Sequence, residues 1–192
     1  MEVTDPDLWH PDHPTLYTLS VSIKEGGTIV DALSTRTGIR KFEIVDSKLM
    51  INGTPFLLVG TNRHQEYPYI GNALSDNAQY RDAVKIKEAG FNIVRLSHYP
   101  QANAFMDACD ELGLLTIAAI PGWQFVGNEK FMEHSYRDAR ELIRRDRNHA
   151  SVVMWELSLN ESGMPDDFMR RMNEIAREES PESKLITCGW ID

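Results

Sequence analysis

Several apolar segments of this chain end in side chains that can move a proton or bind a polyol. The clearest case is segment 151–159, which is followed directly by Asn160 and Glu161. A carboxylate at the end of a buried strand costs free energy unless it has a partner or a function. Glu161 is therefore the first candidate for a catalytic group. Glu156, inside the same segment, is a competing carboxylate that also fits a buried structural partner for an arginine.

The other apolar segments end in imidazole, guanidinium, amide and indole groups. Indole rings stack on the apolar face of a pyranose, and polar groups bond its hydroxyls, so this set fits a sugar. A lone histidine or tryptophan in such a place is often structural. The groups are Asn62, Arg63, His64, Gln65 and Glu66 after the first segment; Arg95, Ser97, His98 and Tyr99 after the second; Trp123 and Gln124 after the third; and Trp190 and Asp192 at the fifth.

Cleavage of a glycosidic bond needs two carboxyl groups, one protonated to release the leaving group and one ionised to attack or to activate water. Glu161 is the single strongly placed candidate in the sequence. No Ser–His–acid order and no cysteine nucleophile stands out. The residues thus indicate half of a glycosidase site.

Five apolar segments alternate with four helical ones and must position these groups. Continuous apolar runs are typical of parallel strands covered on both faces, so the fold class is α/β. No glycine-rich phosphate fingerprint follows a strand, which disfavours a nucleotide-binding open sheet. A (β/α)8 TIM barrel has eight strands, and we expect about the first five, with the chain cut in mid-barrel. The expected strands are 56–64, 91–98, 114–121, 151–161 and 184–190, and the helices 76–89, 103–112, 130–147 and 165–179.

The first part of the chain has a different pattern. Segments 16–23, 27–33 and 39–44 read as short β-strands separated by turns and indicate a piece of a β-sandwich. Asn52-Gly53 between β-rich runs predicts a hairpin. We expect the last sandwich strands in residues 1–45 and the truncated barrel in 46–192.

The composition excludes several classes of function. A formal charge of −9, from 29 acidic and 20 basic residues, argues against nucleic-acid or anionic-membrane partners. No run reaches the roughly 18 apolar residues of a membrane span. The two cysteines, at predicted buried positions, lack the paired spacing of a zinc site. Residues 1–20 show no signal peptide pattern, and the compartment is left open.

Two long motifs resemble glycoside hydrolase family 2, the family of β-galactosidases, β-glucuronidases and β-mannosidases. Segment 92–100 (NIVRLSHYP), followed by Phe105-Met106, Cys109-Asp110 and Gly113, is similar to its first signature. Segment 146–155 (DRNHASVVMW), running to Asn160-Glu161, is similar to its second. Shorter matches lie at Leu16-Tyr17, Gly38-Ile39-Arg40, Ile51-Asn52-Gly53 and 60–64 (GTNRH), so the resemblance covers nearly the whole chain.

The resemblance implies an immunoglobulin-like sandwich before a barrel that hydrolyses β-linked sugars with retention of configuration. It implies that Glu161 is the general acid/base and that Asn160 bonds the sugar 2-hydroxyl. Arg95 would orient the nucleophile, and His64 and His98 would line the pocket. The family's nucleophile is a second glutamate on a later strand, expected beyond the last residue of this chain. The 192 residues alone are therefore expected to be inactive.

Three departures from the family pattern limit what is carried over. Leu96 replaces a small polar residue, and one extra residue separates Trp155 from Asn160-Glu161, where a bulge could absorb it. Segment 118–124 (AAIPGWQ) replaces an acidic stretch that supplies magnesium ligands in some β-galactosidases. We therefore expect no metal, and Trp123 as a pocket wall or sugar platform.

The substrate expected first is a β-galactoside, because 62–66 (NRHQE) resembles the β-galactosidases most. A β-glucuronide or a β-mannoside is the alternative within the family, and a non-catalytic sugar-binding fragment is the alternative outside catalysis. The exposed sheet edges of half a barrel also favour association with a second copy.

Overall fold

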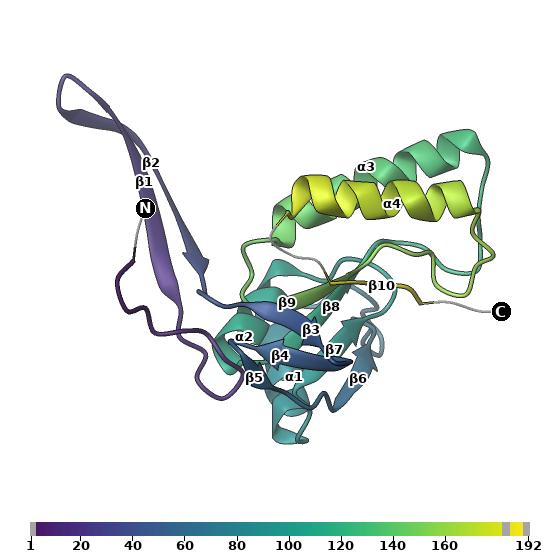
Figure 1. Ribbon diagram of the computed structural model, residues 1–192, viewed down its shortest axis with the longest axis horizontal. Coiled ribbons are helices and arrows are strands. Elements are labelled where there is room, and N and C mark those ends of the chain that lie inside the picture. Colours follow the sequence, from purple (N-terminus) through teal and green to yellow (C-terminus); the bar gives the residue numbers. More distant parts are fainter. Residues whose placement is uncertain (1–2, 182–184, 190–192) are drawn as a thin grey trace.

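A five-stranded parallel sheet forms the centre of the computed structural model, which describes residues 3–181 and 185–189 (Figure 1). The strands lie in the order β10-β9-β8-β7-β6, which is their order along the chain. A doubly wound sheet reverses direction at a switch point, whereas a barrel adds each strand beside the previous one. The sheet is therefore part of a (β/α)8 barrel, as expected. Its strands are β6 (Gly60–Arg63), β7 (Ile93–Leu96), β8 (Leu115–Ala119), β9 (Val152–Glu156) and β10 (Ile186–Thr187).

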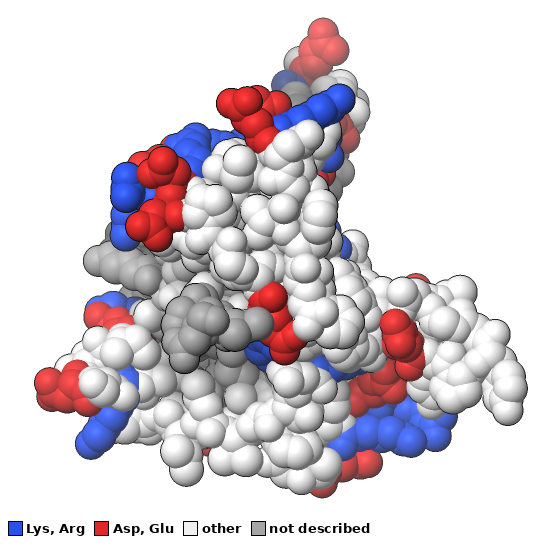
Figure 2. Space-filling view, turned by 90° about the vertical axis from the view of Figure 1, so that its right-hand side faces the viewer, with Lys and Arg blue, Asp and Glu red and all other residues white. Residues whose placement is uncertain are grey.

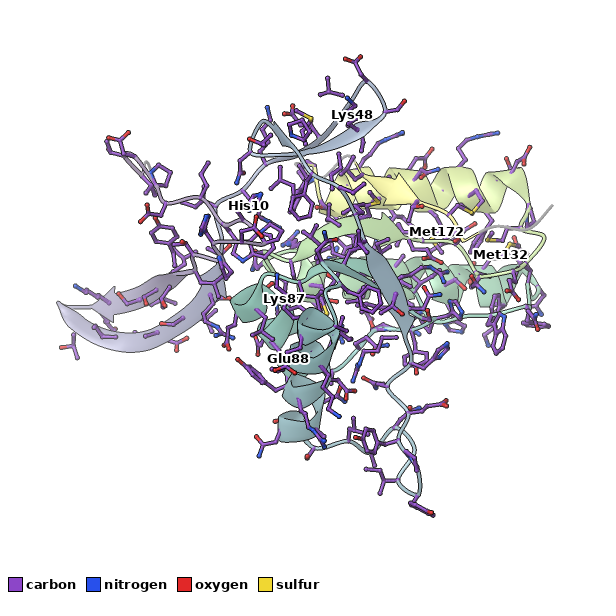
Figure 3. The ribbon with its side chains drawn as sticks, turned by 90° about the horizontal axis from the view of Figure 1, so that it is seen from below. His10, Lys48, Lys87, Glu88, Met132 and Met172 are labelled. Carbon is purple, nitrogen blue, oxygen red and sulfur yellow. The ribbon has the colours of Figure 1, made fainter. Side chains whose placement is uncertain are left out.

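Four helices connect successive strands and cover the outer side of this sheet: α1 (Asp76–Glu88), α2 (Asn103–Leu112), α3 (Glu129–Asp146) and α4 (Asp166–Glu179). Each begins and ends within one residue of its predicted bounds. Asn128 caps α3 by accepting a hydrogen bond from the Phe131 amide, and Gly113 ends α2 at a φ of +67°. Figure 3 shows Met132 of α3 and Met172 of α4 within this helical layer, which packs on the sheet through a continuous apolar core.

A smaller antiparallel sheet, β3 (Phe42–Val45), β4 (Lys48–Ile51) and β5 (Thr54–Pro55), precedes the barrel strands. Asn52 and Gly53 both have positive φ, and the predicted hairpin is confirmed. Leu49 and Ile51 of β4 belong to the same buried cluster as Ile93, Leu115 and Val153, which lie in the first two residues of three barrel strands. The small sheet thus contributes to the inner core of the barrel.

The strands β1 (Tyr17–Glu25) and β2 (Thr28–Thr37) pair antiparallel and project from the rest of the molecule (Figure 1). Their apolar residues Leu19, Val21, Ile23 and Leu33 are exposed. Trp9 anchors the base of this hairpin: it is fully buried and its indole donates to the Asp110 carbonyl over 2.9 Å. Association with a second copy, which we expected from the sheet edges of half a barrel, stays a prediction.

The structure differs from the sequence expectations in several details. The barrel strands are shorter than predicted, because residues at both ends of the apolar segments lie in loops beside the sheet. Strand β3 pairs with β4, although we grouped its residues with the sandwich strands, and the boundary at residue 45 stays a proposal. Cys188 is exposed rather than buried, because it follows the two-residue edge strand β10, while Cys109 is buried as expected.

Trp190 and Asp192, expected at the end of the fifth strand, lie outside the described residues. Within the described residues, none of the helices combines the length and apolar character that a membrane crossing requires.

Candidate active site

A hollow of about 540 Å³ opens where β6, β7 and β8 end. The carboxyl ends of barrel strands are where such enzymes place their chemistry. Figure 2 views the molecule from the right-hand side of Figure 1, and much of the visible surface belongs to residues other than Lys, Arg, Asp and Glu. The hollow is lined by His64, Glu66, His98, Tyr99, Pro121, Gly122 and Trp123. The structure therefore brings together three of the predicted site residues, His64, His98 and Trp123.

Aromatic rings form one wall of the hollow. The ring centres of His64 and His98 are 5.4 Å apart, and those of His98 and Trp123 are 5.9 Å apart. Burial, with the positive charge of Arg95 as a second cause, lowers the pKa of His98 below its usual value, so its imidazole is neutral at pH 7. Trp123 is 56% exposed, which leaves its ring face open for stacking.

Glu161 lies in the loop after β9, beside this wall. Its carboxylate accepts a hydrogen bond from Trp123 Nε1 over 3.0 Å and one from Gln124 Nε2 over 2.7 Å. These donors, Trp123 first, lower the pKa of Glu161 below its usual value. Glu161 is exposed rather than buried, because β9 ends at Glu156 and the last residues of the predicted strand form the loop. It is nevertheless on the same rim as the histidines.

Removing the indole donor should change the titration of Glu161. We expect Trp123→Phe to raise the pKa of Glu161 toward its usual value, because the ionised carboxylate loses its main stabilising hydrogen bond. Carbon-detected NMR titration of the Glu161 carboxyl measures this directly. Phe125→Leu, which changes an exposed aromatic residue nearby, is the matched control. A pKa that is equal in the Trp123→Phe variant and the unmodified chain would contradict the hydrogen bond.

Arg95 and Asn160 meet next to the wall, around Glu156. The Arg95 guanidinium forms a bidentate ion pair with Glu156, with Nε donating over 2.5 Å and Nη2 to the second oxygen. Nη2 also donates to Asn160 Oδ1 over 2.8 Å. The structural interpretation of Glu156 as a buried partner for an arginine is therefore confirmed, since Glu156 is 1% exposed.

Other polar residues at the strand ends serve the fold. Arg63 is buried and bonds Gln79, Asp82 and Gln101 on the helical side. The Gln65 side chain accepts from the Ala102 amide at the start of α2. Both belong to the motif that we linked to sugar binding, and neither lines the hollow.

Gly189, after β10, is a site residue that the sequence did not reveal. A Cβ on this glycine would lie 2.5 Å from Arg95 Nη2 and 2.8 Å from Asn160 Oδ1, so only glycine lets the chain pass the cluster. Its amide donates to Ser158 Oγ over 2.8 Å, and its carbonyl accepts from the Glu161 amide over 3.2 Å. A glycine after a short strand is common, so no signal in the sequence marks it.

The groups around Glu161 do not fit a magnesium ion. The Glu161 carboxylate accepts hydrogen bonds from the N–H groups of Trp123 and Gln124, and an indole N–H offers no lone pair to a cation. Within the described part of the chain, Asp107, Asp110 and His149 come close enough to share a metal. Asp110 and His149 already bond each other over 2.7 Å, and Asp107 pairs with Arg36, so these groups are satisfied without one.

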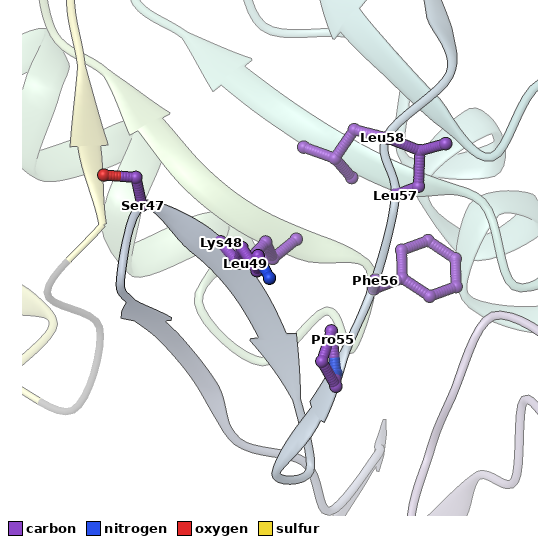
Figure 4. Close-up of a pocket in the computed structure, with 7 residues that line it drawn as sticks. All are labelled: Ser47, Lys48, Leu49, Pro55, Phe56, Leu57 and Leu58. Carbon is purple, nitrogen blue, oxygen red and sulfur yellow. The ribbon is translucent and has the colours of Figure 1, made fainter.

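A second hollow of about 530 Å³ lies beside the hairpin of β4 and β5 (Figure 4). Its lining is mainly apolar, from Leu49, Pro55, Phe56, Leu57 and Leu58, with Ser47 and Lys48 at its edge. None of the predicted site residues contributes to it. The rim with Glu161 is thus the better candidate for chemistry.

Two family models together match nearly the whole chain. Residues 42–189 match the TIM barrel domain of glycosyl hydrolases family 2, and residues 1–40 match a second domain model named for glycosyl hydrolases family 2.

Curated relatives are similar over most of this chain. The β-galactosidase of Thermoanaerobacter pseudethanolicus is 47% identical over 93% of the chain, and that of Thermoanaerobacterium thermosulfurigenes is 42% identical over 97%. A putative β-glucuronidase of Formosa agariphila is 35% identical over 99%. The chain spans about a quarter of the length of each relative, 24%, 26% and 25%.

A solved structure has the same fold. The FMN-binding β-glucuronidase from Facaelibacterium prausnitzii L2-6 superimposes with a TM-score of 0.91 at 34% identity, over 97% of this chain and 30% of that one. Together with the two family models, this similarity decides the family. The chain belongs to glycoside hydrolase family 2.

Proposed function

We propose that this chain forms part of the active site of a retaining β-galactosidase, with Glu161 as its general acid/base. The observation that supports this most is the position of Glu161, on the rim of the barrel beside Trp123 and the histidine wall. The protonated carboxyl would donate to the glycosidic oxygen, and the carboxylate would then activate water. The attacking carboxylate is proposed to come from outside these 192 residues.

The other residues would bind and orient the sugar. Trp123 offers an open indole face for the pyranose, and His64 and His98 offer ring nitrogens for its hydroxyls. Asn160 would bond the 2-hydroxyl. In this chain Glu161 has a lowered pKa. A negatively charged nucleophile about 5 Å away would raise the pKa of Glu161 and keep it protonated for the first step.

The lining of the hollow favours a neutral sugar over a uronate. Lysine and arginine are absent from the described residues that line it, and Glu66 adds a negative charge. The nearby Arg95 guanidinium already donates to Glu156 and Asn160. A uronate carboxylate binds best to a cation. β-Glucuronidase is the second candidate, because several relatives and solved structures carry that name.

A chimera tests the activity and the sugar together. Residues of this chain would replace the matching quarter of the Thermoanaerobacter pseudethanolicus β-galactosidase, to which they are 47% identical. We expect a folded chimera to hydrolyse nitrophenyl β-galactoside at least about tenfold faster than the β-glucuronide, because one unpaired charge costs more than 1.4 kcal/mol. The reverse preference would contradict the choice of sugar. A folded chimera inactive on every β-glycoside would contradict the proposed function.

The 192-residue chain alone should show no turnover. Glu156 is locked in its ion pair with Arg95, so it cannot serve as the second carboxyl group. We expect hydrolysis of nitrophenyl β-galactoside to equal the blank. Hydrolysis above the blank that is lost in Glu161→Gln would show that the chain contains its own nucleophile.

We also propose that no metal assists Glu161, so EDTA should leave the activity of the chimera unchanged.

A further inference from the structure

We propose that Glu156 is a positioning residue, which holds Arg95 so that Arg95 fixes the side-chain amide of Asn160 with its N–H groups toward the sugar. This inference rests on the proposed function for its sugar and on the described contacts for its geometry. Neither the family signatures nor the pocket lining assigns a role to Glu156.

A bulge in β9 places Glu156 on the side of the sheet where Arg95 lies. Thr116 of β8 pairs with Val152, but the next residue, Ile117, pairs with Met154, so β9 has one extra residue. Val153 and Met154 both pack in the inner cluster, whereas Val152 and Trp155 pack in the outer one. In a regular strand, sides alternate at every residue. Without the bulge, Glu156 would share the outer side of Val152, away from Arg95.

This bulge is not the one that the sequence suggested. The extra residue of the family motif lies between Trp155 and Asn160, whereas the bulge lies before Trp155. After β9, the main chain of Asn160 returns to pair with that of Trp123, and the Gln124 amide donates to the Asn160 carbonyl over 2.9 Å. The backbone of Asn160 is therefore held by the neighbouring loop, and its side chain is left for Arg95 to orient.

The ion pair is built to be rigid. Both Glu156 oxygens accept from one guanidinium, which fixes its plane. The Glu156 side chain is 1% exposed and that of Arg95 22%, so water competes little for these bonds. Gly189 closes the cluster, because any side chain there would overlap the Glu156 carboxylate. A lysine or a rotated arginine could not make the same three contacts.

The contact with Arg95 determines which atom of the Asn160 amide faces the sugar. Its Oδ1 accepts from Arg95 Nη2 over 2.8 Å, which points the amide oxygen toward the cluster. The amide nitrogen then faces the other way, where its hydrogen bond to the Glu161 carboxylate helps to lower the pKa of Glu161 and its second N–H can donate to a sugar hydroxyl oxygen. Without the negative charge of Glu156, the guanidinium would lose its fixed plane, and Asn160 would lose the donor that orients its amide oxygen.

Side-chain NMR of the 192-residue chain tests the geometry without any ligand. We expect the order parameter of the Asn160 side-chain amide to fall into the flexible range, below about 0.6, in Glu156→Gln. Glu178→Gln, which removes a carboxylate of an exposed ion-pair cluster on α4, is the matched control and should leave Asn160 unchanged. If Glu156→Gln does not fold, Arg95→Met with Glu156→Met leaves no unpaired charge, and the same loss of order is expected. An Asn160 amide that stays rigid overturns the proposal.

Measurements of sugar affinity distinguish a failure of the Glu156 role from a failure of the proposed function. Titration with methyl β-galactoside and its 2-deoxy analogue should show the first binding about 3- to 10-fold more tightly, the value of one hydrogen bond. Asn160→Ala and Glu156→Gln should each remove this difference. If Asn160→Ala removes it and Glu156→Gln does not, the inference fails and the site stands. If the unmodified chain shows no difference, the 2-hydroxyl role of Asn160 fails, and the order parameter alone decides for Glu156.

Discussion

Replacing Glu161 by glutamine in the chimera is expected to lower kcat/KM by about 10²- to 10⁴-fold, the usual contribution of a positioned general acid/base. Glutamine keeps the size of the side chain but can neither release nor accept the proton. The hydrogen bonds from Trp123 and Gln124 hold the carboxylate in its place on the rim, and glutamine offers them one carbonyl oxygen. The steady-state rates of the two chimeras on a series of aryl β-galactosides measure the effect.

The leaving group distinguishes a lost acid from a damaged pocket. A dinitrophenolate departs without protonation, so its galactoside should lose much less in the first step than lactose does. Glu129→Gln, on the exposed first turn of α3, is the matched control and should keep full activity. Equal losses for all leaving groups would mean that Glu161 shapes the pocket without transferring a proton. Full activity of Glu161→Gln would remove it from the mechanism.

The helices and the strand order could be predicted because local signals determine them. Gly113 ends α2 with a positive φ, and the apolar stripe of α3 gives its length. The (β/α)8 class followed from alternation, since parallel strands need covering helices. Strand ends were less predictable, because apolar residues such as Leu157 and Leu159 are buried in the loop after β9 as completely as in a strand. An apolar run therefore predicts which residues are buried, but it does not predict where the strand stops pairing with its neighbours.

The site could be located from the sequence, but its internal contacts could not. Glu161 was identified by its position after a strand, although it is exposed and the cost of burial was the wrong reason. The pairing of Arg95 with Glu156 depends on the bulge in β9, which changes the side of every later residue of that strand. No residue type marks that bulge. The contact with Gly189 joins parts of the chain that only the sheet brings together.

Arg63 shows where residue type alone misleads. It ends β6 next to His64, and the motif that contains it resembles the sugar site, yet its side chain is 5% exposed and lies among the helices. Its guanidinium lies 3.9 Å from the centre of the Phe105 ring and donates to Asp82 over 2.6 Å. Successive side chains of a strand point to opposite faces, and Arg63 occupies a position of β6 whose side chain points away from the pocket.

Arg63→Met is therefore expected to lower the free energy of unfolding by about 3–5 kcal/mol while leaving sugar affinity unchanged. The loss comes from removing one partner of a buried charge network, which leaves the Asp82 carboxylate and the amide oxygens of Gln79 and Gln101 without their donor. Urea unfolding followed by circular dichroism measures the first quantity, and titration with methyl β-galactoside the second. Arg170→Met removes an exposed pair with Asp167 on α4 and should change stability by less than about 1 kcal/mol. If Arg63→Met instead keeps its stability and loses sugar binding, the guanidinium serves the pocket, and the alternation of β6 has been assigned to the wrong face.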